Sequence, residues 1–167
     1  MGTRRGLTAG EIALGRAAFG ERVPLERVTF VDGPAGNPIA RAAFRNGNGA
    51  ITLRRTIYFA PAYYQPDFSA GKAEAIGLFV HELAHVWQYE TLGTGRFLVR
   101  YVREYAACGF KAWRMYEYDH GVTPFRGARL EAQAEMAGNY AQARADGDAA
   151  KMAVFAKNLQ GSGFFGL

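Results

Sequence analysis

Residues 74–90 carry apolar side chains around the whole circumference of a predicted helix. The apolar positions are Ala75, Ile76, Leu78, Phe79, Val80, Leu83, Val86 and Trp87. A helix on a protein surface shows one apolar stripe, whereas a helix that is apolar on all sides is buried. We therefore predict a helix in the interior of the protein that ends at Gly93.

An earlier helix has a clear start signal. Thr8 and Glu11 have the spacing of a capping box, in which each side chain accepts a hydrogen bond from the backbone amide of the other residue. Gly20 favours termination, because glycine readily adopts the backbone conformations that follow a helix. The pattern predicts a helix over residues 9–19.

Short runs with strand-like spacing follow this helix. We predict strands at 28–31, 39–44, 51–53 and 56–59. Residues 46–49 read Asn-Gly-Asn-Gly, and Asn-Gly supplies the positive φ angles that a tight hairpin needs. Together these runs predict a small, mostly antiparallel sheet.

The remainder of the chain is mainly helical. We predict helices at 96–107, 128–143 and 149–158, and an extended or irregular stretch at 113–118. A chain of 167 residues with 49% hydrophobic and 21% charged residues has the size and composition of one folded domain. We expect a single α+β domain over residues 1–167, in which an N-terminal helix and a small sheet precede the buried helix and a C-terminal helical lobe.

The net charge of +5 raises the question of nucleic-acid binding. The basic residues are spread along the chain, and no nucleic-acid motif accompanies them. Binding of a polyanion would need one contiguous positive patch. We expect a solvated basic surface and no nucleic-acid partner.

Cysteine content and hydropathy bear on the compartment. Cys108 is the only cysteine, so the chain forms no intramolecular disulfide and needs no oxidising compartment. The N-terminal residues lack the apolar run of a secretory signal, and no stretch approaches the roughly 20 apolar residues of a membrane span. We expect no membrane partner, and a location in the cytoplasm or export by a route that reads no N-terminal signal.

A metal-binding pattern lies inside the predicted buried helix. His81 and His85 are four residues apart, so one helix face can aim both rings at one point, and Glu82 borders the same space. Two imidazoles at about 2.0–2.1 Å from Zn²⁺ leave room for a third protein ligand and a water molecule. Glu82 can take a proton from that water and later pass it to a departing amine. These three residues predict a catalytic zinc site.

The third ligand is expected on a later helix. The metzincin pattern needs Gly and His where this chain has Gln88 and Thr91, so that class is excluded. Glu131 and Glu135 lie one helical turn apart, which lets one carboxylate bind zinc while the other hydrogen-bonds a ligating imidazole. Periodicity alone does not decide between them.

The two motifs resemble those of the gluzincin-type metallopeptidases. His-Glu-Leu-Ala-His-Val-Trp-Gln, followed by Glu-Ala-Gln-Ala-Glu, is similar also to the small bacterial metallopeptidase-like domains labelled Vgr-related, which occur near type VI secretion and polymorphic toxin systems. The resemblance implies a zincin-like fold with Glu131 as ligand and Glu135 hydrogen-bonded to a ligand. Glu135 stands where these peptidases usually have Asp.

The resemblance also implies a Tyr or His that stabilises the oxyanion formed on the scissile carbonyl. Tyr118 and His120 lie between the two motifs and are the candidates, and Gln88 shares the metal face of its helix. The alternative is that Tyr118 is a core aromatic residue and His120 a turn residue.

These observations predict zinc-dependent hydrolysis of a peptide or protein substrate. The resemblance links the protein to secretion-system effectors, with a secretion-system component or an immunity protein as partner. The alternative function is a non-catalytic adaptor or structural domain of a secretion system that keeps the zinc for stability.

Overall fold

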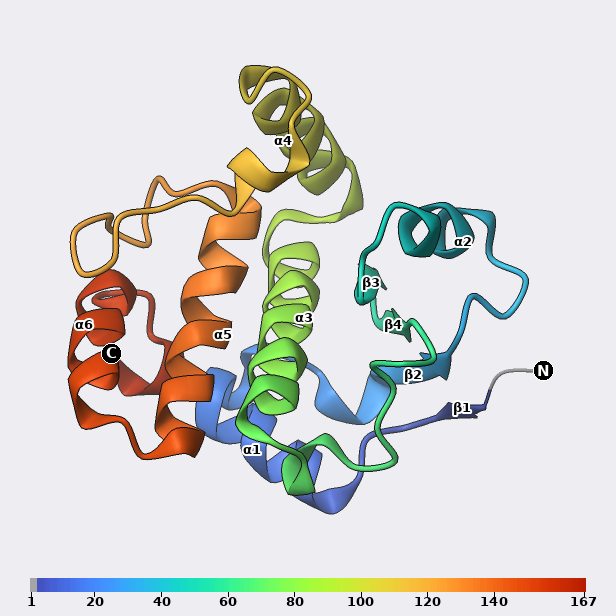
Figure 1. The fold of residues 1–167 in the computed structure, drawn as a ribbon, viewed down its shortest axis with the longest axis horizontal. Coiled ribbons are helices and arrows are strands. Elements are labelled where there is room, and N and C mark those ends of the chain that lie inside the picture. Colours follow the sequence, from blue (N-terminus) through green and yellow to red (C-terminus); the bar gives the residue numbers. More distant parts are fainter. Residues whose placement is uncertain (1–2) are drawn as a thin grey trace.

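The computed structural model describes residues 3–167, which form six α-helices and one four-stranded sheet (Figure 1). The helices are α1 Ala9–Phe19, α2 Pro38–Arg45, α3 Ala73–Leu92, α4 Thr94–Ala107, α5 Leu130–Asp146 and α6 Ala149–Leu159. The strands are β1 Arg4–Arg5, β2 Thr29–Asp32, β3 Ala50–Leu53 and β4 Thr56–Phe59. The expected α+β architecture is confirmed.

The sheet is small and has the order β1-β2-β4-β3. β2 and β4 run parallel, whereas the β1-β2 and β3-β4 pairs are antiparallel. Two of the three pairings therefore agree with the mostly antiparallel sheet that the sequence predicted. β3 is an edge strand, and it lies against α3.

The predicted strand at 39–44 is wrong, because this segment is the helix α2. The Asn37 side chain accepts hydrogen bonds from the backbone amides of Ile39 and Ala40, and Pro38 occupies the first turn, where its missing N–H costs nothing. Residues 46–49 consequently end a helix and do not form the predicted hairpin. The hairpin of the sheet joins β3 to β4 instead.

Glu11 fixes the start of α1 and ties it to its neighbours. The predicted capping box with Thr8 is present, with the Thr8 amide 2.8 Å from the Glu11 carboxylate. This carboxylate is fully buried and also accepts hydrogen bonds from the Phe68 amide, at 2.9 Å, and from the Arg5 guanidinium, at 2.7 and 2.8 Å. A buried carboxylate needs such partners, so these contacts hold the N-terminal strand, α1 and the loop before α3 together.

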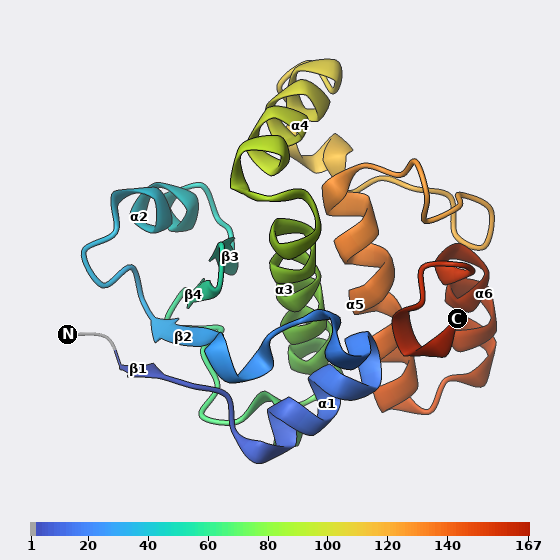
Figure 2. The ribbon, with the colours of Figure 1, turned by 180° about the vertical axis from the view of Figure 1, so that it is seen from behind.

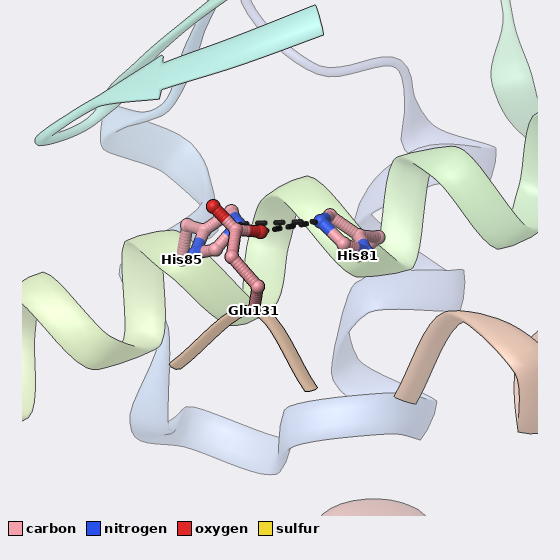
Figure 3. A group of neighbouring side chains, drawn as sticks. All are labelled: His81, His85 and Glu131. Atoms are coloured by element: carbon pink, nitrogen blue, oxygen red, sulfur yellow. Dashed lines mark hydrogen bonds and ion pairs between the residues drawn. The ribbon is translucent and has the colours of Figure 1, made fainter. Parts of the chain in front are cut away.

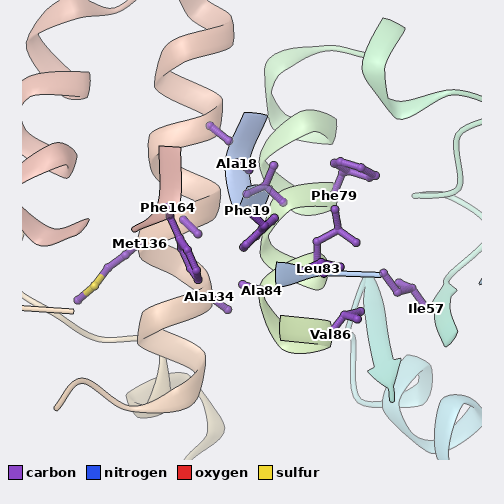
Figure 4. Packing of buried hydrophobic residues seen from close by; sticks show 14 of the residues in the cluster. Ala18, Phe19, Ile57, Phe79, Leu83, Ala84, Val86, Ala134, Met136 and Phe164 are labelled. Atoms are coloured by element: carbon purple, nitrogen blue, oxygen red, sulfur yellow. The ribbon is translucent and has the colours of Figure 1, made fainter. Parts of the chain in front are cut away.

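α3 runs through the middle of the molecule, with the sheet and α2 on one side and α5 and α6 on the other (Figures 1 and 2). Figure 4 shows this core: Ile57 and Phe79 lie on the sheet side of α3, and Ala134 and Met136 lie on α5. The predicted buried helix is confirmed.

α4 projects from this body (Figures 1 and 2). Gly93, with φ at 76°, separates it from α3 and allows the change of direction. Residues 113–118, expected to be extended or irregular, begin within the short 3-10 turn Ala112–Met115. Within residues 3–167, no helix combines the length and the apolar character needed to cross a membrane.

Candidate metal centre

Three buried side chains from two helices converge at one point (Figure 3). His81 and His85 lie one turn apart on α3, and Glu131 lies in the first turn of α5. Their potential ligand atoms all lie within 4.8 Å of one another. The Glu131 Oε2 atom is 3.4 Å from His81 Nε2 and 3.1 Å from His85 Nε2, and the two Nε2 atoms are 3.2 Å apart.

The close approach of α3 and α5 brings Glu131 to the histidines. The helices meet where Gly77 faces Gly138, and a Cβ atom at Gly138 would lie 2.8 Å from the Gly77 carbonyl oxygen and 3.2 Å from the His81 Cβ. Side chains at this contact would keep the helices apart. The glycine pair therefore sets the distance between the helix with the imidazoles and the helix with the carboxylate.

The ring of His85 is held by Gln88. The Gln88 amide nitrogen donates to the Leu130 carbonyl at 2.8 Å, so its oxygen faces His85 Nδ1, which lies at 2.8 Å. An amide oxygen can only accept, and His85 Nδ1 therefore carries the proton. This leaves Nε2, on the side of Glu131, as the atom available to a metal ion.

The ring of His81 is held by Glu135 and Tyr116. His81 Nδ1 lies 3.2 Å from Glu135 Oε2, and the Tyr116 ring stacks on the imidazole with centroids 6.0 Å apart. Glu135 thus accepts from Nδ1, and Nε2 points to Glu131. Each imidazole therefore has a hydrogen-bond acceptor at Nδ1, on the side of the ring that faces away from the other two potential metal ligands.

The charges of the site are strongly coupled. Burial opposes a charge on His81, but hydrogen bonds to Glu131 and Glu135 raise its pKa to about 10. Burial likewise opposes the shift at His85, and the Glu131 charge raises the pKa of that imidazole too. Burial alone would raise the pKa of Glu131, but its interactions with both histidines hold that pKa well below its usual range. Glu131 is therefore ionised, and a metal ion that binds here displaces protons from the imidazoles.

Glu82 is buried beside His81 and has one side-chain partner outside its helix. The Thr52 hydroxyl on β3 donates to Glu82 Oε2 at 2.7 Å and also lies 3.2 Å from the Glu82 carbonyl oxygen. Thr52 is buried between two less buried apolar neighbours, Ile51 and Leu53. The edge strand therefore fixes the carboxylate next to the three donor atoms.

Two cavities of about 210 and 250 Å³ meet at this site and share Asn48, Ala50, His81, Glu82 and Tyr116. The first cavity is bordered mainly by small and polar residues, namely Gly77, Gly138, Asn48, Glu135, Asn139 and Gln142. The second has mainly apolar walls, namely Ile39, Ile51, Leu53, Tyr89, Phe97, Leu98 and Tyr101. Glu82 thus lies where a polar and an apolar cavity meet.

Tyr118 and His120, the predicted oxyanion donors, border neither of these cavities. The Tyr118 hydroxyl accepts from the Asn139 amide at 2.8 Å, and the His120 ring packs between Tyr118 and Phe155. Of Tyr116 and Tyr118, it is Tyr116 that borders both cavities. Alternation along an extended chain would give Tyr116 and Tyr118 the same side, so the sequence carried no signal to choose between them.

Tyr116 and Tyr101 present hydroxyl groups that remain protonated. Burial, followed by the charge of Glu131, raises the pKa of each well above its usual range. A protonated phenol is a hydrogen-bond donor, so both can donate to an oxyanion or a carboxylate. No sequence motif points to Tyr101, which lies on α4 and borders the cavity because the chain bends at Gly93.

The donor set fits a zinc ion. Four ligands about 2.1 Å from Zn²⁺ at tetrahedral angles are roughly 3.4 Å apart, and the three separations at this site are 3.1, 3.2 and 3.4 Å. Two imidazole nitrogens and one carboxylate oxygen are the ligand types that zinc takes in hydrolytic sites that keep a fourth position open. These residues can therefore hold a metal ion, with Glu82 at its side.

Comparison with known proteins agrees with this architecture. Residues 13–93 match the family model of the eCIS core domain. The effector domain of Pseudomonas aeruginosa VgrG2b has a similar fold, with a TM-score of 0.67, 22% sequence identity, and coverage of 94% of this chain and 82% of that one. No curated protein matches the chain. The matched segment ends after α3, so it includes both histidines and Glu82 and excludes Glu131.

Proposed function

We propose that this protein is a zinc-dependent peptidase. The observation that carries the proposal is the convergence of His81, His85 and Glu131 beside the buried carboxylate of Glu82. Donor spacing suited to zinc and an adjoining cavity on each side of Glu82 support it. Zinc at this site would polarise a peptide carbonyl and lower the pKa of a water molecule.

The chain's own residues supply the proton transfers. Glu82 can accept a proton from the attacking water and deliver it to the departing amine. The Thr52 hydroxyl holds Glu82 Oε2 in one position for this task. The Tyr116 phenol can donate to the oxyanion that forms on the scissile carbonyl. Tyr116 thereby replaces Tyr118 and His120 in the role that the sequence had suggested for them.

The edge strand β3 supports a peptide as substrate. Ala50 to Leu53 border the apolar cavity, and β3 pairs with β4 along one side only. An extended peptide can pair with the free backbone groups of an edge strand and so lie across the site. A peptide bound in this way would pass Glu82.

The similarity to an effector domain supports a role in a secretion system. The similar structure is named an effector domain of VgrG2b, and that similarity spans nearly the whole of this chain. The eCIS core match covers the part that includes α3. We infer that the protein acts as a secretion-system-associated effector, and that its partner is a component of that system.

A non-catalytic adaptor stabilised by zinc is the second function to test. It is favoured by one observation: the donor atoms join α3 to α5, so zinc would link two helices of the core. Such a domain would bind zinc equally well and need no proton acceptor. A substitution of Glu82 therefore distinguishes the peptidase from the adaptor.

The test is the substitution Glu82→Gln, with Glu74→Gln as the matched control on the exposed first turn of α3. Zinc content is measured by elemental analysis, and cleavage is measured on a mixed peptide library by mass spectrometry. Glu82→Gln should retain zinc and lose at least about 100-fold in cleavage rate, because a general base contributes about 10² to 10⁴. Zinc binding by the wild type without any metal-dependent cleavage would support the adaptor instead.

A further inference from the structure

Large exposed apolar side chains gather on one segment of the surface. Of the nine that the described residues expose, five lie between positions 98 and 113. They are Leu98 at 50% exposure, Val99 at 61%, Val102 at 61%, Phe110 at 67% and Trp113 at 58%. Scattered apolar residues are normal on a surface, but a concentration of them on one element indicates an interaction site.

α4 presents these residues because it is attached to the body along one side only. Its inner side is held by Phe97, whose ring stacks on Tyr89 at 3.8 Å and on Tyr101 at 6.0 Å. Phe97 is the single buried residue of the helix. At 100° per residue, Val99 and Val102 therefore point away from the attachment side, and Leu98 lies at the edge between the two sides.

Basic residues flank this apolar face. Arg96, Arg100 and Arg103 share the adjacent side of α4, and Lys111 and Arg114 follow it. The described contacts include an acidic partner for Arg100 alone, namely Glu104 at 2.7 Å. The other oxygen of Glu104 accepts from the Leu130 amide at 2.8 Å, and no other acidic residue occurs between Thr94 and Arg114. The segment thus presents an uncompensated positive charge beside an apolar face.

Aromatic and basic side chains also alternate where the segment turns back to the body. Phe110 and Trp113 are exposed, Lys111 is exposed between them, and the Arg114 guanidinium lies 5.3 Å from the centre of the Trp113 ring. Tryptophan and phenylalanine beside Lys and Arg are typical of protein segments at the boundary between lipid headgroups and acyl chains.

We propose that α4 and the turn after it, residues 94–114, dock onto a phospholipid surface with anionic headgroups. The apolar face enters the boundary of the acyl chains, and the basic flank lies level with the phosphates. Nucleic acid would match the charge but offers no hydrocarbon to Val99 and Val102. Because α4 projects from the body, it reaches a flat surface without obstruction by the rest of the chain (Figures 1 and 2).

This docking brings the apolar cavity to the lipid surface. Leu98 lies on the apolar face of α4 and also borders the cavity with His85 and Glu131. The docked protein would therefore open its cavity beside the headgroups. The docking itself needs neither zinc nor catalysis, so it stands or fails separately from the proposed peptidase activity.

The experiment is co-sedimentation of the full chain with vesicles of phosphatidylcholine, alone or mixed with phosphatidylglycerol. Wild type should sediment with the mixed vesicles and not with phosphatidylcholine alone, and added salt should weaken this binding. The pair Arg96→Glu and Arg103→Glu should weaken it at least tenfold, since each basic residue near an anionic surface contributes roughly a fivefold factor. The pair Val99→Ser and Val102→Ser should weaken it as well.

The control quadruple variant is Val122→Ser, Val154→Ser, Arg126→Glu and Lys157→Glu, which changes exposed residues outside the segment 94–114. It should bind as wild type does, and circular dichroism should show that all variants are folded. Equal sedimentation of wild type with both kinds of vesicle overturns the proposal. Binding that survives the valine substitutions also overturns it, because the protein would then bind through its arginines alone, as it would to any polyanion.

Discussion

At the scale of single residues, the two histidines are oriented by different acceptors. Gln88 holds His85 through a neutral amide, and Glu135 holds His81 through a carboxylate. Both leave Nε2 facing Glu131. The three potential ligand atoms that converge thus include an oxygen of Glu131, whereas Glu135 contacts His81 at Nδ1.

Substitutions of Glu131 and Glu135 should reduce zinc affinity to different degrees. Glu131→Ala removes a donor atom and should reduce zinc binding drastically, as His85→Ala should. Glu135→Ala removes only the partner of His81 Nδ1, so it should cost about 10–100-fold in affinity. A titration against a competing zinc chelator measures both. The opposite order would make Glu135 the ligand and would contradict the arrangement in Figure 3.

Thr52 should control how well Glu82 works. Thr52→Val keeps the shape of the side chain and removes the hydroxyl that donates to Glu82 Oε2 at 2.7 Å. A hydrogen bond to a charged group contributes about 1.5–3 kcal/mol, so kcat/KM should fall by roughly 10–100-fold with zinc retained. Thr52→Ser should restore most of the activity and the wild-type pH profile. An unchanged pH profile in Thr52→Val would show that the contact is only structural.

The sequence predicted the residues of the site unevenly. His81, Glu82 and His85 share one helix, so their spacing alone places them together. Thr52 and Tyr116 reach the site from other elements, and their approach depends on how β3 and the segment after α4 pack on α3. The sequence carried no signal for Thr52, because a polar residue between two apolar ones in a strand indicates a solvent-facing position, whereas the structure buries Thr52 more than either neighbour.

At the scale of elements, the approach of α3 and α5 decides whether the site assembles. Gly138→Ala would place a Cβ atom 2.8 Å from the Gly77 carbonyl oxygen, so the helices must move apart. The free energy of unfolding should fall by about 1–3 kcal/mol, and zinc affinity should fall with it. Chemical denaturation and zinc titration measure the two effects.

Gly95→Ala is the matched control for this prediction. Gly95 lies on α4 with no atom within 4 Å of the added Cβ. The substitution should raise helix stability by up to about 1 kcal/mol and leave zinc affinity unchanged. A Gly138→Ala protein as stable as wild type would show that the helices are not held apart by this Cβ.

Local signals also explain which elements were predicted. α1, α3 and β4 follow from capping, all-round apolarity and β-branched runs within one segment. The strand prediction at α2 is wrong because Ile39 to Phe44 have strand-like spacing, but the cap at Asn37 and the proline at position 38 favour a helix more strongly. The parallel β2-β4 pair and the two-residue β1 could not be foreseen, because both depend on partners distant in the sequence.

At the scale of the whole molecule, metal removal should lower thermal stability. A ligand that binds the folded chain and not the unfolded chain stabilises the fold by about 4 kcal/mol when its concentration is a thousandfold above its Kd. For a chain of this size that corresponds to a Tm increase of roughly 8–16 °C. Differential scanning calorimetry with zinc and after EDTA treatment measures it. His81→Ala with His85→Ala should show no zinc-dependent increase, and an EDTA-treated wild type with an unchanged Tm would contradict the site.

The location of Glu131 on a helix distant in the sequence has one more consequence. His85 and Glu131 are 46 positions apart, but their helices pack directly on each other, and the connection through α4 lies outside that contact. Covalent continuity between the two helices is therefore not what assembles the donor atoms. A chain cut near Phe110 would consist of two interlocked fragments, one with both imidazoles and one with the carboxylate. The zinc ion would then be bound by ligands from two separate molecules, which the shared hydrophobic core holds together.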